Sequence, residues 1–362
     1  MVRLLRRVPT STSGALPHDP LVGLAELVIS GMWAVTGRLR RPGPPRGGGS
    51  LRLTVLDRRP VARDGSVVAV TFAAADGSAL PRWHPGAHLD LTLPSGRVRQ
   101  YSLCGDPADT GRYRIAVRRV PHGGGGSVEV HDALPVGATV GTHGPRNAFP
   151  LALPGHGSPA RRLRFIAGGI GITPILPMLA VADRAAVDWS LTYCGRSRAA
   201  LPFLDELGGY GPRVRVRTDD AAGVPTATEL LADCPPGTAV YACGPAPMLA
   251  AIRAELAGRR DVELHFERFA APPVLGGRPM TVRVASTGAT VPVAADEPVL
   301  AALQRAGVEV PYSCRQGFCG TCRTRVRGGR VEHRDTLLTG PERAAGWMLV
   351  CVSRGEDLTL EL

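Results

Sequence analysis

The sequence predicts a multidomain chain with three folds in series: an antiparallel β-barrel, an α/β domain with a parallel sheet, and a small α+β domain. Three observations support this order. Short strand-like segments separated by turn signals occupy residues 51–155, strands alternate with helices over 156–272, and strands flank one helix and a cysteine-rich loop over 278–362. At 362 residues the chain is also too long for one ordinary core.

Residues 51–155 are expected to form the barrel. Turn signals such as "LPSG" and "DPADTG" separate short runs that are rich in Val, Leu and Thr. Such even spacing of short strands is typical of a small antiparallel barrel. The expected strands are 51–56, 67–73, 88–93, 99–103, 113–119 and 139–142.

Residues 156–272 are expected to form the α/β domain. Strand-like runs such as "LRFIAG", "DWSLTYCG" and "TAVYACG" alternate with helical stretches, of which "TPILPMLAVADRA" and "APMLAAIRAEL" are the longest. This alternation predicts a parallel sheet covered by helices on both faces. After a linker at 271–277, the last domain is expected to contain strands at 280–285 and 290–293 and a helix at 298–306.

The first fifty residues are predicted to be an extension outside these folds. Residues 1–19 are rich in Arg, Ser and Pro and are expected to be disordered, and residues 41–50 ("RPGPPRGGGS") are expected to be a linker. Between them Asp19-Pro20 starts an apolar run that ends at Gly37 and contains one acid, Glu26. A membrane span needs about 20 apolar residues, so a helix that is packed on the body or partly disordered is favoured over an interfacial membrane helix, a span or a signal.

Composition narrows the function classes. The net charge is +12, but every one of the 43 basic residues is Arg, so the charge reflects a compositional bias. Only 17 aromatic residues are present and no basic stripe carries them, which argues against nucleic-acid binding. Eight cysteines in a chain of this length do not suggest a secreted disulfide framework, and a cytoplasmic location is expected.

Four of these cysteines form a spaced group near the C-terminus. Cys314, Cys319 and Cys322 have the spacing C-x4-C-x2-C, and Cys351 follows 29 residues after Cys322. This spacing is the plant-type arrangement in which four thiolates hold a [2Fe-2S] cluster. A zinc site usually has two short cysteine pairs, and inert or regulatory thiols would leave the spacing unexplained. The intervening glycines would let backbone amides turn toward sulfur.

A glycine turn follows the first strand of the α/β domain. In "FIAGGIGITPIL" (165–176) a strand, a glycine turn and a helix succeed one another, which would let a pyrophosphate approach the backbone. Gly169-Ile170-Gly171 lacks the third glycine of the Rossmann fingerprint, so a plain βα turn is the alternative. Cys243 ends another strand of this domain, at the edge where open α/β sheets bind ligands.

Four motifs in order carry a resemblance to a known family. These are "RQYSL" (99–103), "GGIGITP" (168–174), "CGP" (243–245) and the C-terminal cysteine pattern. Over residues 51–362 the chain resembles the phthalate dioxygenase reductase family of the ferredoxin–NADP reductase superfamily. The resemblance implies a flavin-binding barrel, an NAD(P)-binding domain and a β-grasp ferredoxin domain.

The resemblance also implies which residues bind the flavin. Arg99 would pair with the flavin phosphate, Tyr101 would lie against the isoalloxazine, and Ser102 would hydrogen-bond the ring. Gly125, Gly126 and Ser127 fall in the glycine-rich phosphate segment, for which a flexible hairpin loop is the alternative. The family's flavin is FMN, and FAD remains an alternative.

The nucleotide residues follow in the same way. The nicotinamide side of NADH or NADPH would be held by Gly168, Gly169, Gly171, Thr173 and Pro174, and bordered by Cys243, Gly244 and Pro245. Phe269 would cover the flavin ring unless it is a core residue. Arg196 and Ser197 would lie at the adenosine ribose, where they could bind a 2′-phosphate or form a solvated turn. Family habit favours NADH.

The expected function is an electron relay without an acid–base catalytic residue. A nicotinamide gives up two electrons together and a cluster takes one, so a flavin must lie between them. The terminal acceptor would be a Rieske-type oxygenase by family analogy, with a haem-thiolate monooxygenase as an alternative. A redox sensor or adaptor with little turnover is the third hypothesis. His84 and His88 are interpreted as structural.

Overall fold

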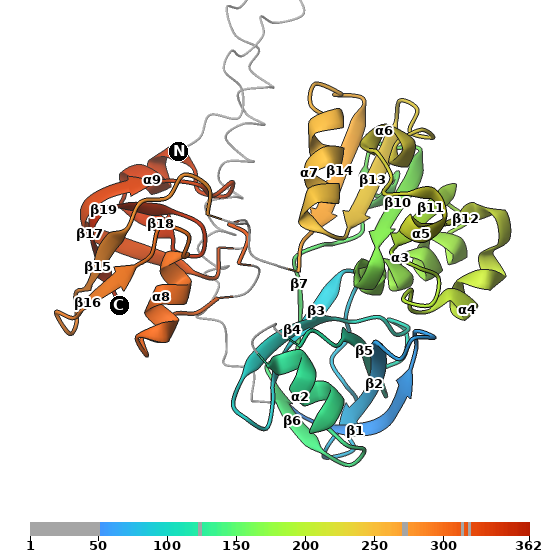
Figure 1. Ribbon diagram of the computed structural model, residues 1–362, viewed down its shortest axis with the longest axis horizontal. Helices are drawn as coiled ribbons and strands as arrows, with labels where there is room; N and C mark the ends of the chain where they lie inside the picture. Colours follow the sequence, from blue (N-terminus) through green and yellow to red (C-terminus); the bar gives the residue numbers. More distant parts are fainter. Residues whose placement is uncertain (1–50, 122–124, 270–273, 313–314, 318–319) are drawn as a thin grey trace, which may run out of the picture. The chain divides into compact units, whose positions relative to one another are not determined.

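The computed structural model describes residues 51–121, 125–269, 274–312, 315–317 and 320–362. The N-terminal extension, with its expected helix and linker, lies outside the described residues. The described chain contains three main sheets, which correspond to the three expected folds (Figure 1).

The first sheet has seven strands, all paired antiparallel, in the order β4-β3-β6-β1-β2-β5, with β7 paired to β3. Its inner face packs around buried side chains such as Leu53, Phe72 and Leu89. One short helix, α2 (Gly126–Asp132), lies between β5 and β6 in the sequence. The strands are β1 (Leu51–Pro60), β2 (Val67–Ala74), β3 (Ala87–Thr92), β4 (Val98–Ser102), β5 (Tyr113–Arg118), β6 (Thr139–Thr142) and β7 (Pro145–Asn147). The expected antiparallel barrel is confirmed.

The second sheet is parallel and has the order β12-β11-β10-β13-β14. The strand order reverses between β10 and β13, which is the switch point where open α/β sheets bind ligands. The strands are β10 (Arg162–Gly168), β11 (Trp189–Gly195), β12 (Val214–Thr218), β13 (Thr238–Cys243) and β14 (Val262–Glu267). A two-stranded pair, β8 (Leu153–Pro154) with β9 (Gly157–Ser158), precedes it.

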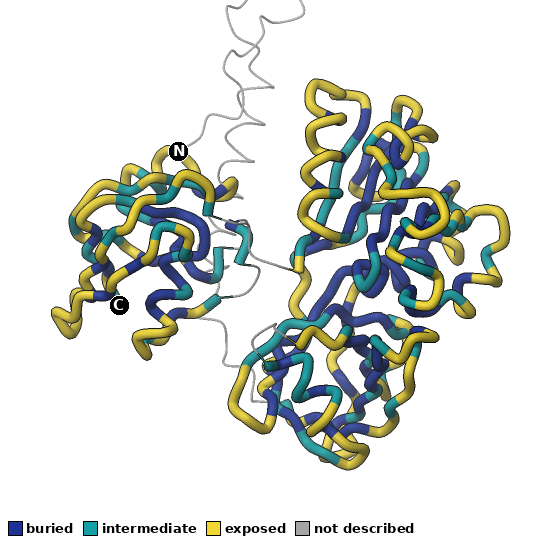
Figure 2. The backbone as a smooth tube through the Cα atoms, viewed as in Figure 1, coloured by how far each residue is buried: buried dark blue, intermediate teal, exposed yellow. Residues whose placement is uncertain are grey.

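Helices cover the parallel sheet, as the alternating pattern predicts. The two longest, α3 (Ile172–Arg184) and α7 (Ala246–Glu255), begin directly after the turns that follow β10 and β13. Shorter helical segments are η1 (Gly169–Gly171), α4 (Leu204–Leu207), η2 (Gly208–Arg213), α5 (Asp219–Ala222) and α6 (Ala227–Leu230). Figure 2 shows the strands of this sheet as a buried layer with exposed residues on the surrounding helices.

The third sheet has five strands in the order β16-β15-β19-β17-β18. Its β15 and β19 run parallel, and its other pairs are antiparallel. A mixed sheet with one packed helix, α8 (Val299–Arg305), is the expected β-grasp arrangement. The remaining elements are β15 (Met280–Val284), β16 (Thr290–Val293), β17 (Arg323–Glu332), α9 (Gly340–Ala344), β18 (Trp347–Leu349) and β19 (Arg354–Glu361).

Candidate functional site

The predicted flavin residues lie on β4, at the edge of the barrel sheet. Arg99 and Tyr101 are two residues apart and share one face of the strand, whereas Ser102 lies on the other face. Tyr101 is partly buried against the barrel core, and burial raises its pKa to about 12, so its hydroxyl stays protonated. Ser102 is buried opposite His88 of β3. The strand therefore offers a guanidinium and a neutral phenol to one side.

The glycine segment meets Arg99 of β4 and Arg97, which directly precedes this strand. A Cβ atom added to Gly126 would lie 2.6 Å from Nε of Arg99, and one added to Gly125 would lie 3.6 Å from Cζ of Arg97. Gly125 has φ 81°, a left-handed conformation that favours glycine. Two guanidinium groups thus lie directly against a backbone without side chains, which fits a phosphate-bearing ligand. Gly123 and Gly124 lie outside the described residues.

Ser127 lies near the start of α2 and bonds to the backbone of Val120. Its hydroxyl accepts a hydrogen bond from the Val120 amide (3.0 Å) and donates one to the Val120 carbonyl (3.2 Å). These contacts tie the start of α2 to the segment that follows β5. The role this geometry supports for Ser127 is to hold the loop.

The turns after β10 and β13 pack against each other at the switch point. A Cβ atom on Gly168 would lie 2.5 Å from Cδ of Pro245, one on Gly171 would overlap the Cys243 carbonyl, and one on Gly244 would overlap the Met248 side chain. Side chains are therefore excluded at three predicted positions because the two turns touch. Gly169, in the same turn, has φ 56°, a left-handed conformation that favours glycine. A nucleotide at this edge would meet bare backbone, which fits a pyrophosphate or nicotinamide.

Thr173 and Pro174 lie buried in the first turn of α3. The Thr173 hydroxyl donates to the Ile170 carbonyl (3.0 Å). The single O–H of Tyr193 lies within hydrogen-bond distance of the carbonyls of Gly169 (3.0 Å) and Pro202 (3.1 Å). These bonds fix the glycine turn from two sides. The Thr173 hydroxyl therefore stabilises the conformation of the glycine turn.

Cys243 is fully buried at the end of β13, and its register partner on β14 is Glu267. Burial, with the nearby Glu267 carboxyl, raises the pKa of the Cys243 thiol well above its usual range. Burial also raises the pKa of Glu267 to about 8. Among the described residues the Oε2 atom of Glu267 has no hydrogen-bond partner. A protonated carboxyl and a protonated thiol therefore lie side by side at the switch point.

Glu267 was not predicted from the sequence. The strand "VELHFE" carries two acids, Glu263 and Glu267, and only the β13–β14 register shows that Glu267 lies beside Cys243. Phe269 follows two residues later and is 51% exposed, so it is not a core residue. An exposed ring at this position fits the predicted cover for a flavin.

Arg196 and Ser197 follow β11 at the same sheet edge. Arg196 is exposed and its carbonyl accepts from the Asp220 amide (3.0 Å), while Ser197 Oγ accepts from the Ala200 amide (3.3 Å). The loop continues onto the barrel, where the Asp64 amide donates to the Ala199 carbonyl (3.0 Å) and Arg118 to the Ala200 carbonyl (2.8 Å). The loop that carries these residues thus joins the two folds.

Two of the four predicted cluster ligands are described. Cys322 begins the approach to β17 and Cys351 follows β18, and both are 2% exposed. Their strands pair, and the Val350 amide points to the Cys322 carbonyl (3.5 Å). Gly317 and Gly320 have φ of 80° and 78°, which fits a loop whose amides turn inward. Cys314 and Cys319 lie outside the described residues.

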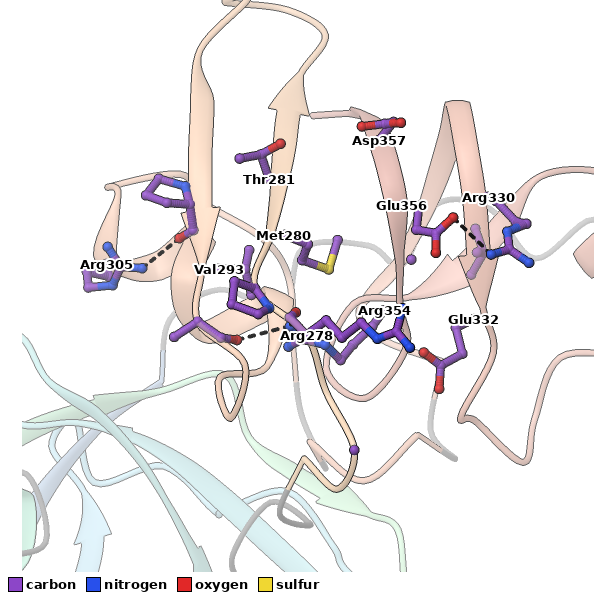
Figure 3. A pocket seen from close by; sticks show the side chains of 16 residues that line it. Arg278, Met280, Thr281, Val293, Arg305, Arg330, Glu332, Arg354, Glu356 and Asp357 are labelled. Atoms are coloured by element: carbon purple, nitrogen blue, oxygen red, sulfur yellow. Dashed lines mark hydrogen bonds and ion pairs between the residues drawn. The ribbon is translucent and has the colours of Figure 1, made fainter.

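A cavity of about 1240 Å³ lies on the C-terminal domain (Figure 3). It is lined by side chains of β15, β16, β17 and β19, including Arg330 and Arg354. Arg354 donates to the carbonyls of Arg278 (2.8 Å) and Ala294 (3.0 Å), and Arg330 pairs with Glu356 (2.9 Å). None of the predicted site residues lines this cavity.

Comparison with known proteins agrees with this geometry. Residues 282–355 match the model of the 2Fe-2S iron-sulfur cluster binding domain. The chain is 43% identical over 296 residues to phenoxybenzoate dioxygenase subunit beta of Ectopseudomonas oleovorans, covering 80% of this chain and 90% of that protein. It is 32% identical to the solved structure of phthalate dioxygenase reductase, with a TM-score of 0.67, covering 88% of this chain and all of that chain.

The chain belongs to the phthalate dioxygenase reductase family. It also resembles part of an intact type IV self-sufficient cytochrome P450 monooxygenase, at 38% identity and a TM-score of 0.67, covering 91% of this chain and 44% of that one. As a member of the phthalate dioxygenase reductase family, the chain is an oxidoreductase that uses a flavin, a pyridine nucleotide and a [2Fe-2S] cluster.

The described residues contain no helix that is both long and apolar enough to span a bilayer. The apolar run at 21–37 lies outside them.

Proposed function

We propose that the chain is the reductase component of a Rieske-type oxygenase system. It would take electrons from NADH and deliver them singly to its partner through a cluster held by Cys314, Cys319, Cys322 and Cys351. The observation that carries the proposal is the combination of an arginine–glycine site on the barrel, a switch-point site on the parallel sheet and buried cysteines on the third sheet. A cytoplasmic location, where NADH is produced, goes with this role.

The bound groups would supply the redox chemistry, since a flavin accepts an electron pair and releases single electrons to a cluster. The chain's own residues position them. Arg99 and Arg97 would bind the flavin phosphate, while Tyr101 and Phe269 would lie against the ring. Gly168, Gly171 and Gly244 would let the nicotinamide approach the sheet edge. Cys243 and Glu267, both protonated, would keep this edge uncharged beside the ring.

The flavin is proposed to be FMN. The positive groups at Gly125 and Gly126 belong to Arg97, which directly precedes β4, and Arg99 on β4, and this pair suits a single terminal phosphate. Release of the flavin by heat, followed by chromatography, tests this assignment directly. Recovery of FAD would require a second nucleotide site that the proposal does not include.

NADH is proposed as the donor over NADPH. Asp219 and Asp220 follow β12 at the same sheet edge as Arg196, and the Asp220 amide binds the Arg196 carbonyl. Two acidic residues at this edge of the sheet would oppose the charge of a 2′-phosphate. The kcat/KM values for NADH and NADPH test this preference. Replacing both aspartates by Asn should raise kcat/KM for NADPH and leave that for NADH nearly unchanged.

A haem-thiolate monooxygenase is the second candidate partner, because the chain is similar to a segment of a self-sufficient cytochrome P450. Reconstitution with a Rieske oxygenase and with a haem-thiolate enzyme, each followed by product formation per NADH consumed, separates the two. The whole proposal is tested with the purified holoprotein and cytochrome c as acceptor. NADH-driven reduction supports a reductase. Its absence with one flavin and two irons bound per chain would favour the sensor hypothesis instead.

A further inference from the structure

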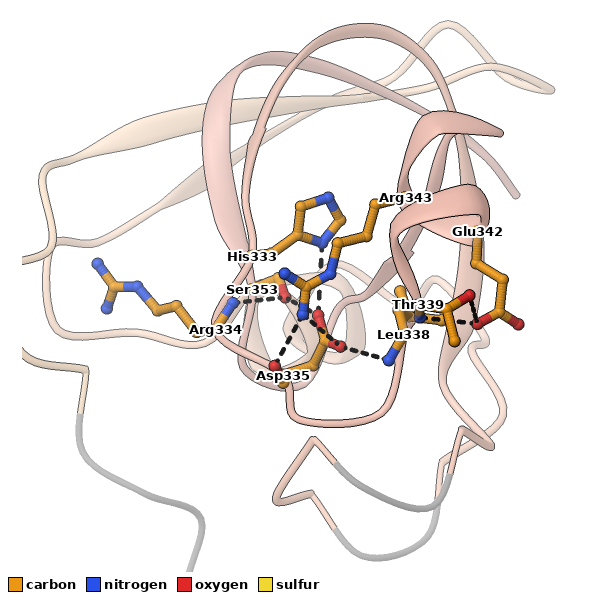
Figure 4. Close-up of polar contacts among 8 residues, drawn as sticks. All are labelled: His333, Arg334, Asp335, Leu338, Thr339, Glu342, Arg343 and Ser353. Carbon is orange, nitrogen blue, oxygen red and sulfur yellow. Dashed lines mark hydrogen bonds and ion pairs between the residues drawn. The ribbon is translucent and has the colours of Figure 1, made fainter. Parts of the chain in front are cut away.

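A buried carboxylate lies at the centre of a polar cluster in the C-terminal domain (Figure 4). The side chain of Asp335 has no exposed surface, and its Oδ2 accepts from the Leu338 amide (2.8 Å) and from Arg343 (3.3 Å). Its Oδ1 lies 3.4 Å from both Ser353 Oγ and His333 Nδ1. Burial alone would raise the pKa of Asp335, but the Leu338 amide and Arg343 hold it below the usual value. The carboxylate is therefore ionised at neutral pH.

The segment that carries Asp335, residues 333–339, is here called the clamp segment. It touches the cysteine loop at both of its glycines. The Thr336 amide donates to the Gly317 carbonyl (3.1 Å), and a Cβ atom on Gly317 would lie 3.2 Å from the Asp335 Cα. A Cβ atom on Gly320 would lie 2.9 Å from Cδ2 of Leu337. The clamp segment thus packs against the loop between Cys314 and Cys322.

The clamp segment also reaches the fourth cysteine. The Arg334 amide donates to Ser353 Oγ (3.2 Å), and Ser353 lies two residues after Cys351. Leu338 is buried in the same core as Cys322 and Cys351. One carboxylate therefore organises a segment that contacts the cysteine loop on one side and the Cys351 segment on the other.

We propose that Asp335 is a positioning residue for the cluster: it holds the clamp segment against Gly317, Gly320 and the Cys351 segment, and its charge, with that of Arg343, tunes the cluster's reduction potential. Residues that orient metal ligands without binding the metal typically change metal affinity when replaced. This inference rests on the proposed assignment of the four cysteines. Wild-type protein without bound iron would contradict that assignment, whereas loaded wild-type protein with unaffected variants contradicts the inference alone.

The experiment compares holoprotein variants at Asp335 with a matched carboxylate. Glu297 is the control, since it accepts from the Ala294 amide (3.2 Å) and pairs with Arg305 (2.9 Å) beside α8 in the same domain. Iron release to a chelator is followed by the loss of visible absorbance. Asp335→Ala should release iron about 10- to 100-fold faster than wild type, and Glu297→Ala within about twofold of it. An unchanged rate for Asp335→Ala, or an equal acceleration in both variants, overturns the proposal.

The reduction potential separates positioning from general destabilisation. Asp335→Asn removes a negative charge and should shift the cluster potential to more positive values, since an added electron is then less repelled. Arg343→Gln removes the facing positive charge and should shift it the opposite way. Glu297→Gln should leave it unchanged. Shifts of the same sign at positions 335 and 343, or none, contradict the proposal.

A backbone variant covers the case in which Asp335→Ala fails to fold. Gly317→Ala places a methyl group 2.6 Å from Cγ2 of Val352 and against Asp335, whereas Gly288→Ala meets no atom within 4 Å. Both glycines have positive φ, of 80° and 72°, so the cost of the backbone conformation is matched. Faster iron release in Gly317→Ala than in Gly288→Ala supports the clamp. Equal release in the two variants counts against it.

Discussion

The barrel and the parallel sheet share a hydrophobic core, whereas the C-terminal sheet has its own. One cluster of buried residues joins Val67 and Ala116 of the barrel to Phe165 and Tyr241 of the parallel sheet. The C-terminal cluster draws only on residues from 280 to 362. This difference suits the two transfer steps expected of the chain. Hydride transfer needs the nicotinamide and flavin rings held in a fixed geometry, which a shared core provides. Single-electron transfer to the cluster can involve a domain with a core of its own.

The largest expected effect is loss of the cluster from the C-terminal domain, with the other two domains unaffected. Cys322→Ser should abolish cluster binding and lower NADH-driven cytochrome c reduction at least about 100-fold. Replacing a residue that only orients a metal ligand already costs up to about 100-fold in activity, and loss of a ligand should cost more. Flavin reduction by NADH should continue, because the shared core of the other two folds is untouched. Iron content per chain and stopped-flow flavin absorbance measure the two halves separately.

Cys104→Ser is the matched control for this prediction. Cys104 is buried in the shared core and is not among the four predicted ligands. Its variant should keep full iron content. If Cys322→Ser keeps the wild-type iron content and the wild-type rate of cytochrome c reduction, the assignment of the four cysteines as cluster ligands is wrong.

The second effect concerns Glu267 in the parallel sheet. Its pKa is about 8 in the folded chain against 4.5 ordinarily, so between these values the folded state holds a proton that the unfolded state has lost. The free energy of unfolding should therefore fall as pH rises through this window, by up to about 1.4 kcal/mol per pH unit. Glu267→Gln removes this slope. Urea unfolding of both proteins at pH 5, 6.5 and 8 should show the variant gaining relative to wild type at high pH.

Parallel pH curves for wild type and Glu267→Gln would mean that the carboxyl is ionised in the folded protein. Below pH 4.5 the two proteins should differ by a constant amount, because both states of the wild type are then protonated. The cluster content of the variant should stay at the wild-type level, which separates this effect from the C-terminal unit.

A third, smaller effect tests the packed turns of the switch point. Gly171→Ala adds a methyl group that overlaps the Cys243 carbonyl, and relief of such overlap typically costs about 1–3 kcal/mol. The KM for NADH should rise while iron content is unchanged. Gly208→Ala is the control, since Gly208 has φ −59° and a Cβ atom there meets no atom within 4 Å. An equal KM in both variants would contradict a nucleotide site at this turn.

Sequence reasoning reached the features that depend on neighbours in the chain. The expected helices at 173–185 and 246–256 differ by a residue at most from α3 and α7, because Pro174 and the apolar period mark them locally. Two short helices were not predicted. Helix α2 directly follows a run of glycines, which hides it in the sequence. Helix α9 carried a local signal that was overlooked, the capping box of Thr339 and Glu342.

The features that sequence reasoning missed depend on the tertiary structure. Glu267 meets Cys243 only through the β13–β14 register, and Asp335 meets Arg343 and Ser353 only when the clamp segment folds back. The sequence also did not indicate the bonds that the Ser127 and Thr173 hydroxyls make with nearby backbone groups, while their predicted roles at the ligands stay predictions. A motif identifies the residue type, and the fold decides which atoms its polar groups meet.

The smallest expected effect concerns an ion pair at the junction of the barrel and the parallel sheet. Glu206 accepts two hydrogen bonds from Arg114 of β5 (2.8 and 2.9 Å), and Arg114 also donates to the Cys104 carbonyl (2.6 Å). Glu206→Ala should lower the free energy of unfolding by about 1–2 kcal/mol and slow flavin reduction by NADH. The neighbouring Asp205 pairs with Arg63 at 3.8 Å on an exposed surface, so Asp205→Ala should cost less than about 0.5 kcal/mol.

Stopped-flow flavin reduction compares these two variants under the same conditions. A slower rate in Glu206→Ala with a normal rate in Asp205→Ala would mean that the shared core alone does not set the approach of nicotinamide and flavin. Electron passage from reduced flavin to the cluster should be unchanged in both, since neither residue contacts the C-terminal core. Equal rates in all three proteins would assign the whole positioning of the two folds to the buried apolar residues, and would contradict a role for the ion pair.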